Sequence, residues 1–177
     1  MTNVKQNSDI ANAQNTEVDE LDYHKYVVFR LGGELYGTQL LSVREVVEEL
    51  PIKRLPNTIQ SFKGVCNLRG QIVGVIDLSA QFKVVGMNRE RPVLLVFDSE
   101  NGALAVEVDH IEAVTIIPPE DIETHVGVLS TVENKFIHGI GKLNNRLVTL
   151  IDLRSILSHQ QLLDISISKI MPKAEAG

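Results

Sequence analysis

One stretch of the chain occurs twice, and this repeat limits the possible folds more than any other feature. Residues Phe62–Leu78 and Ile137–Leu153 align without a gap, with Gly64 on Gly139, and both copies end in Ile-Asp-Leu. Each copy reads as a strand, a tight turn and a second strand rich in branched apolar residues. The repeat therefore predicts two similar β-hairpins at equivalent places in two similar units.

The two copies differ at the turn. The first copy has Arg69-Gly70 where the second has Asn144-Asn145. Asn tolerates the positive φ of a tight hairpin turn, so this geometry accounts for Asn-Asn but gives no advantage to Arg. We therefore expect the Arg69 guanidinium to contact a specific group, and this contact would explain why Arg stands at the turn.

The similarity extends beyond the hairpins. Strands are expected around Gly32-Gly33 and again around Asn101-Gly102, and residues 104–114 align with residues 36–46. Each half then has about five short strands with Gly, Pro and Asn at the turns, a pattern typical of a small barrel. We expect a mainly β protein with a first barrel at about 23–90 and a second at about 91–158.

The ends of the chain and its overall charge add further expectations. Residues 1–22 are polar without a period, which predicts a disordered tail, and residues 159–177 are expected to be partly helical. The net charge of -6 argues against binding to nucleic acid or to an anionic membrane. No apolar run approaches the roughly 18 residues that span a bilayer. With no apolar signal region at the start, a cytoplasmic protein is expected.

The reactive side chains are scattered, so the sequence predicts neither an enzyme nor a cofactor or metal site. Cys66 lies in an apolar strand, which favours a buried and inert thiol. Asp77 and Asp152 are expected to cap short helices, and Glu107 and Asp109 to face solvent. The histidines lack the spacing of metal ligands; they are His24, His110, His125, His138 and His159.

Three strings carry a resemblance to a known family. Phe29-x-Leu-Gly-Gly-Glu-x-Tyr-Gly, Gly64-Val-x-Asn-Leu-Arg-Gly and Ile76-Asp-Leu resemble CheW, the family of chemotaxis coupling proteins, over roughly residues 23–158. The second string is the most specific of the three. The resemblance implies a CheW-like fold, which consists of two SH3-like five-stranded β-barrels with short helices.

The resemblance also implies a function. A stand-alone CheW-like protein is a non-catalytic adaptor that joins the cytoplasmic tip of chemoreceptors to the histidine kinase CheA, through the CheW-like regulatory domain of the kinase. CheV and CheA carry additional domains for which this chain has no room. Two alternatives stay open: a CheV-like adaptor without its receiver domain, and a small-ligand binding module that uses the groove between the barrels.

Family analogy assigns two sets of site residues. The expected kinase-binding residues are Val43, Glu45, Val46 and Gly64. The expected receptor-binding residues are Asn67, Leu68 and Arg69. The chain departs from the family at His125, where an aromatic residue can stand, so the resemblance does not carry a second kinase contact to that loop.

Overall fold

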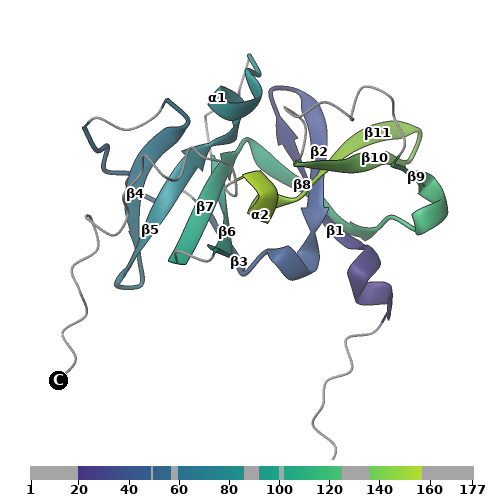
Figure 1. Ribbon diagram of the computed structural model, residues 1–177, viewed down its shortest axis with the longest axis horizontal. Helices are drawn as coiled ribbons and strands as arrows, with labels where there is room; N and C mark the ends of the chain where they lie inside the picture. The colour runs from purple at the N-terminus through teal and green to yellow at the C-terminus, as the bar shows by residue number, and fades with distance from the viewer. Residues whose placement is uncertain are drawn as a thin grey trace, which may run out of the picture.

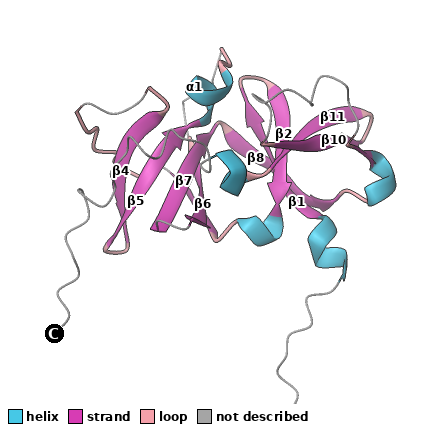
Figure 2. Cartoon of the chain, viewed as in Figure 1, coloured by secondary structure: helices cyan, strands magenta, loops and turns pink. Residues whose placement is uncertain are grey.

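The computed structural model describes residues 20–48, 50–56, 60–85, 92–99, 102–124 and 136–156. Strands dominate, and the helices are short, so the predicted mainly β fold class is confirmed (Figures 1 and 2). The predictions for most of the N-terminal tail, for the C-terminal tail and for His125 lie outside the described residues.

The first half of the chain contains five strands and three short helices. They are η1 Glu20–His24, β1 Lys25–Leu31, β2 Glu34–Gln39, η2 Leu40–Ser42, β3 Glu45–Glu48, β4 Phe62–Leu68, β5 Gln71–Asp77 and α1 Leu78–Phe82. The second half follows the same plan with one additional short strand. Its elements are β6 Val93–Ser99, β7 Gly102–Val108, β8 His110–Ile116, η3 Pro119–Asp121, β9 Ile122–Glu123, β10 Ile137–Leu143, β11 Arg146–Ile151 and α2 Leu153–Ile156.

The strands form two sheets that lie beside each other (Figure 1). The five-stranded sheet has the order β3-β6-β7-β5-β4, and the six-stranded sheet has the order β8-β1-β2-β11-β10-β9. Each sheet therefore contains strands from both halves of the chain. Hairpin β1-β2 joins strands of the second half, and hairpin β6-β7 joins strands of the first.

This exchange corrects the expected division into barrels at about residue 90. The two parallel pairings β5-β7 and β2-β11 join strands that are distant in sequence, and they carry each hairpin into the sheet of the other half. Parallel neighbours cannot be joined by a tight turn, so no local pattern in the sequence indicates them. The division into two units is present, but each unit is assembled from both halves.

The predicted equivalence of the two repeats is confirmed by the register of the strands. Gly74 of β5 lies opposite Leu104 of β7, and Thr149 of β11 lies opposite Tyr36 of β2. Gly74 aligns with Thr149 in the hairpin repeat, and Leu104 aligns with Tyr36 in the preceding strands. The two sheets are thus two copies of one arrangement.

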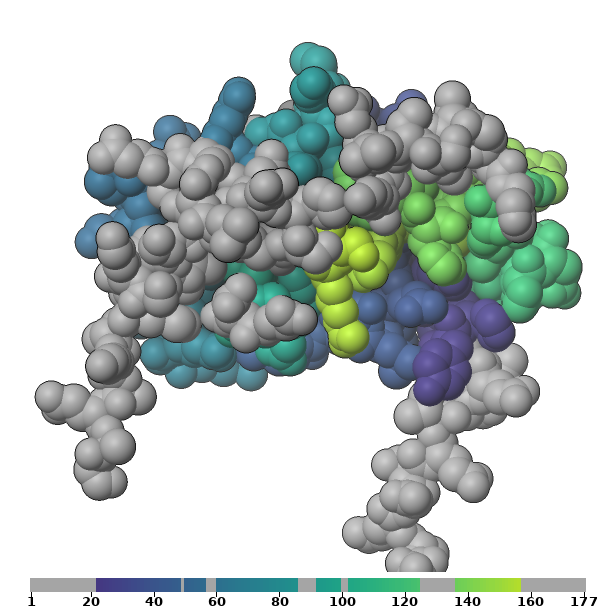
Figure 3. Space-filling view, in the orientation of Figure 1, coloured from purple at the N-terminus to yellow at the C-terminus, as the bar shows by residue number. Residues whose placement is uncertain are grey.

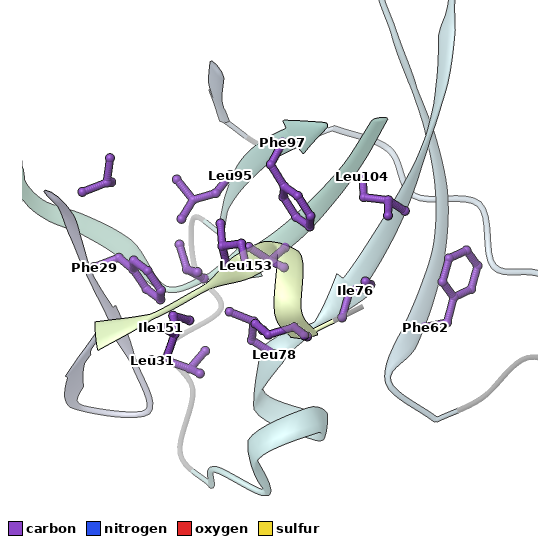
Figure 4. Close-up of a cluster of buried hydrophobic side chains, with 14 residues drawn as sticks. Phe29, Leu31, Phe62, Ile76, Leu78, Leu95, Phe97, Leu104, Ile151 and Leu153 are labelled. Atoms are coloured by element: carbon purple, nitrogen blue, oxygen red, sulfur yellow. The ribbon is translucent and has the colours of Figure 1, made fainter. Parts of the chain in front are cut away.

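The largest apolar cluster lies between the two sheets and receives side chains from both (Figure 4). Phe29 of β1 and Phe97 of β6 hold matching positions in it, and both are fully buried. Leu78 of α1 and Leu153 of α2 pack into the same cluster. Because apolar burial stabilises a fold in proportion to the area removed from water, this shared cluster holds the two sheets together.

Both predicted helix caps are present. Asp77 Oδ1 accepts hydrogen bonds from the backbone N–H groups of Ser79, at 3.0 Å, and Ala80, at 3.1 Å. Asp152 accepts from the backbone N–H of Arg154 at 2.9 Å. Each carboxylate satisfies amide groups that have no partner within the first turn of the helix.

Two carboxylates that were expected to face solvent are buried instead. The Glu107 side chain is 1% exposed and forms an ion pair with Lys63 Nζ from β4. Asp109 is also buried, and its Oδ2 accepts a hydrogen bond of 2.8 Å from the backbone N–H of Gly32. The prediction for Glu107 failed because β7 is buried on both faces, which strand alternation alone does not reveal. Cys66 is buried as predicted, and this burial raises the pKa of its thiol.

Candidate functional site

The expected kinase-binding and receptor-binding residues meet on the five-stranded sheet. Glu45 lies in β3, and Arg69 lies in the turn between β4 and β5. β3 and β4 are the two outer strands of this sheet, yet Arg69 Nη2 is 3.1 Å from Glu45 Oε2. The sheet therefore curls until its edges approach each other, as in a barrel, and the two sets of residues share one surface.

Arg44 extends this contact into a network that the sequence did not indicate. Its Nη1 lies 3.1 Å from Asp98 Oδ1, and its Nη2 donates to Gln71 Oε1 at 3.1 Å. The Nη2 group also lies 3.4 Å from Glu45 Oε1. We call these five residues the charged rim: Arg44, Glu45, Arg69, Gln71 and Asp98. In the sequence, the position of Arg44 between Val43 and Glu45, two of the expected site residues, could have indicated it.

The three apolar site residues differ in exposure. Of the expected residues Val43, Val46 and Leu68, only Val46 is exposed, at 47%. Ile72 of β5, which was not among the expected residues, is 39% exposed. Val43 packs against the central apolar cluster, and Leu68 is 6% exposed within the core of the five-stranded sheet. The Val46 side chain is therefore open to solvent, whereas those of Val43 and Leu68 pack inward against the apolar clusters.

The β4-β5 turn presents the Arg69 side chain to solvent. Arg69 has a φ of 52° and Gly70 a φ of 89°, and the matching Asn144 and Asn145 have φ values of 48° and 61°. Asn67 Oδ1 accepts a hydrogen bond of 2.7 Å from the Gly70 N–H, which fixes the turn. The left-handed conformation is unfavourable for Arg, and such strain concentrates at functional positions. The Arg69 side chain is 81% exposed.

Gly64 has a structural reason to be glycine. Its φ is 147°, and a Cβ atom placed on it would lie 2.3 Å from the Lys53 carbonyl oxygen. Lys53 and Val65 exchange two backbone hydrogen bonds at this point. Gly139 holds the matching place in the other sheet, where a Cβ atom would lie 2.9 Å from the Glu123 carbonyl oxygen. Glycine at position 64 therefore permits the close approach of β4 to the Lys53 backbone.

Comparison with known proteins decides the family. The model of the CheW-like domain matches residues 25–161, which is most of the chain. The chain belongs to the CheW family.

Two relatives and one solved structure agree with the assignment to the CheW family. The chemotaxis protein CheW of Klebsiella aerogenes is 31% identical over 139 residues, covering 78% of this chain and 84% of the relative. That of Helicobacter pylori is 30% identical over 149 residues, covering 83% and 89%. The crystal structure of the scaffolding protein TtCheW from Thermoanaerobacter tengcongensis matches with a TM-score of 0.69 and 29% identity, covering 78% of this chain and 90% of that one.

The six-stranded sheet of this CheW-family chain carries a counterpart of the charged rim with inverted charges. Glu112 of β8 aligns with Arg44, and its carboxylate lies 2.9 Å from both Arg30 Nε and Arg146 Nη2. These two hydrogen bonds, with Arg30 contributing most, hold the pKa of Glu112 at about 2, below its ordinary 4.5. The duplicated CheW fold therefore presents two matching surfaces of different charge.

In the part of the chain that the structure describes, no three His, Cys, Asp or Glu residues gather as metal ligands would. The helices among these residues are also too short or too polar to cross a membrane.

Proposed function

We propose that this CheW-family chain is a non-catalytic scaffold of chemotaxis signalling. In this role it joins the cytoplasmic tip of chemoreceptors to the CheW-like regulatory domain of the histidine kinase CheA. Support comes from the family model over residues 25–161 and from relatives that are named chemotaxis protein CheW. The similar solved structure is that of a scaffolding protein. The place of action would be the cytoplasm, at receptor arrays reached through these partners.

The contact between Arg69 and Glu45 carries the proposal, because it brings the two expected sets of site residues together. The kinase would contact Glu45 and the exposed Val46, with Val43 and Gly64 shaping the surface from below. The receptor would contact Asn67 and Arg69, with Leu68 beneath them in the core. An exposed apolar side chain beside charged groups suits an interface in which burial supplies affinity and charge supplies orientation.

A scaffold of this kind acts through proximity and needs no reactive groups. Binding both partners at once raises the effective concentration of the kinase at the receptor, so moderate affinities suffice for a stable assembly. The scaffold can also shift the kinase between two states if its contacts with these states differ in free energy.

The test is calorimetric titration of the purified chain with a receptor cytoplasmic fragment and, separately, with the CheW-like domain of CheA. Saturable binding to each partner is expected, together with higher kinase autophosphorylation when all three proteins are mixed. The kinase and receptor without the chain serve as the control. Absence of binding to both partners would contradict the proposal.

A further inference from the structure

A small pocket opens on the six-stranded sheet, apart from the charged rim. Its lining comes from β1, β2, η2, β10 and β11, together with Asp152, which follows β11. The lining residues are Tyr26, Gln39, Ser42, His138, Leu150, Ile151 and Asp152. In Figure 3 the neighbouring helix η2 (blue) lies between the purple N-terminal residues and the yellow α2. The volume is about 170 Å³. Pockets for drug-sized ligands measure about 300–1,000 Å³, so this one suits a single side chain better than an organic cofactor.

The repeat shows what fills the matching place in the five-stranded sheet. The hairpin alignment sets Lys63 on His138, and the alignment of the preceding strands sets Glu107 on Gln39. In the five-stranded sheet the Lys63 ammonium reaches the buried Glu107 carboxylate and forms an ion pair with it. In the six-stranded sheet a shorter His and a neutral Gln stand at these two positions.

The strand register supports this equivalence independently of the sequence alignment. Glu107 lies opposite Leu94 in the β6-β7 pair, and Gln39 lies opposite Tyr26 in the β1-β2 pair. Leu94 and Tyr26 are the second residues of β6 and β1, two strands that hold equivalent places in the two sheets. The pocket is therefore the site that a lysine side chain occupies in the other sheet.

The groups that line the pocket are suited to an ammonium ion. The Gln39 side chain lines the pocket, and its Nε2 donates to the Tyr23 carbonyl at 3.3 Å. Ser42 adds a hydroxyl and Asp152 a carboxylate to the lining; the Asp152 oxygens also accept hydrogen bonds from the Arg154 N–H at 2.9 Å and the Ser155 hydroxyl at 2.6 Å. An ammonium group donates three hydrogen bonds and accepts none, so hydroxyl, amide and carboxylate oxygens match it. The apolar Leu150 and Ile151 match the methylene stem that a lysine buries beneath its charge.

We propose that this pocket binds the side chain of a lysine from a partner protein, in the way that the chain's own Lys63 fills the equivalent site. The carboxylate of Asp152 supplies the complementary charge, and the exposed His138 lies at the side from which Lys63 enters in the other sheet.

The probe for the test is n-butylammonium chloride, which has the stem and charge of a lysine side chain. In a titration followed by ¹H–¹⁵N NMR, we expect saturable shifts confined to the residues that line the pocket. n-Butanol, which keeps the shape without the charge, should bind about tenfold more weakly, the ratio that one charged hydrogen bond gives. Equal binding of the two compounds, or no saturable shift with butylammonium, would overturn the proposal.

A second arm distinguishes a protein side chain from a free amine. Nα-acetyl-lysine N-methylamide carries the same ammonium on a peptide backbone, and it should bind within a few-fold of butylammonium. Binding of the free amine alone would show a small-molecule site and would overturn the assignment to a partner protein. Titration of this compound at the same ionic strength keeps the two measurements comparable.

A double variant tests the role of the repeat. Gln39→Glu with His138→Lys introduces into the six-stranded sheet the pair that the five-stranded sheet contains, so the new lysine should fill the pocket and remove butylammonium binding. Retained binding with the wild-type affinity would contradict the proposal. Gln39→Leu provides a check that does not rely on the new pair, because it removes an acceptor and should weaken binding about tenfold.

Discussion

The Arg69 guanidinium lies 3.1 Å from the Glu45 carboxylate. This contact joins the β4-β5 turn, at one edge of the five-stranded sheet, to β3 at the other edge. The two side chains differ in exposure, at 81% for Arg69 and 21% for Glu45. A contact of this kind is screened by water and contributes little to stability. Its importance is positional, because a partner carboxylate or carbonyl can approach the exposed guanidinium from solvent.

Replacement of Arg69 should separate partner binding from folding. Arg69→Ala is expected to weaken receptor binding by about 1–3 kcal/mol, the range for hydrogen bonds of a charged group. Arg69→Lys should recover only part of the loss, because an ammonium group cannot reproduce the planar pair of donors. Calorimetric titration with the receptor fragment measures both effects.

The control is Arg69→Asn, which places at this turn the residue type found at the matching Asn144. Asn tolerates the left-handed conformation, so the free energy of unfolding should stay within about 0.5 kcal/mol of wild type or rise. Receptor binding should be weakened by the same amount as in Arg69→Ala. Unchanged receptor affinity in both variants would remove Arg69 from the proposed site.

Val46 and Val43 provide a matched pair for the proposed kinase surface. Val46→Asp changes a side chain that is 47% exposed, so the melting temperature should stay near wild type while affinity for the CheA domain falls at least about tenfold. Val43→Asp places a charge against the central apolar cluster and should lower the melting temperature. Thermal denaturation and binding are measured on both variants. Full kinase affinity in a folded Val46→Asp protein would contradict the assignment.

Substitutions at Gly64 and Gly70 test whether glycine is required because a Cβ atom would clash or because the backbone has a positive φ. Gly64→Ala brings a Cβ to 2.3 Å from the Lys53 carbonyl oxygen at a φ of 147°, and we expect a loss of about 2–4 kcal/mol in unfolding free energy. Gly70 also has a positive φ, but its Cβ position is open, so Gly70→Ala should cost about 1 kcal/mol. Urea denaturation compares the two. A Gly64→Ala protein as stable as Gly70→Ala would show that the backbone relaxes.

The contribution of the buried Lys63–Glu107 ion pair to the free energy of unfolding should require both side chains. Lys63→Met leaves the Glu107 carboxylate buried without its ion-pair partner and should destabilise the fold by about 3–5 kcal/mol. Adding Glu107→Leu removes the unpaired charge and should restore most of the loss. A double-mutant cycle by urea denaturation measures the coupling between the two side chains. Additive effects of the two changes would mean that the pair is not coupled.

Glu112 should make stability depend on pH in the acidic range. Its pKa of about 2 in the folded chain lies below the ordinary 4.5, so the carboxylate stabilises the fold fully above pH 4.5. The contribution is lost as the pH falls from 4.5 towards 2. The stability difference between wild type and Glu112→Gln should therefore be largest near neutral pH and shrink across this window. A difference that stays constant with pH would contradict the ion pairs.

The sequence predicted the local features of this fold well. A hairpin turn with positive φ at Asn144 and Asn145, a carboxylate cap at Asp77 and a buried Cys66 all follow from short-range patterns. In each case the physical cause lies within a few residues of the chain. The spacing of strands and turns predicted a mainly β protein, and the family strings predicted the CheW-like fold, which the comparisons support.

The features that the sequence did not predict depend on contacts between distant segments. Glu107 reads as an exposed strand residue until the fold buries both faces of β7 and brings Lys63 of β4 to its carboxylate. Leu68 reads as a site residue, but its side chain lies in the core of the five-stranded sheet. Arg44 becomes the centre of the charged rim only when the sheet curls.

The exchange of hairpins between the sheets has a consequence for the chain as a whole. Each half resembles one subunit of a domain-swapped dimer, and the connection near residue 90 makes the two subunits a single molecule. Separated from the other half, the strands β2 and β7 would each lose a parallel neighbour and expose an edge open to pairing with another chain. The covalent link thus supplies each half with one copy of the other half. It keeps β2 and β7 paired within the molecule, so their edges cannot pair with further chains to form a polymer.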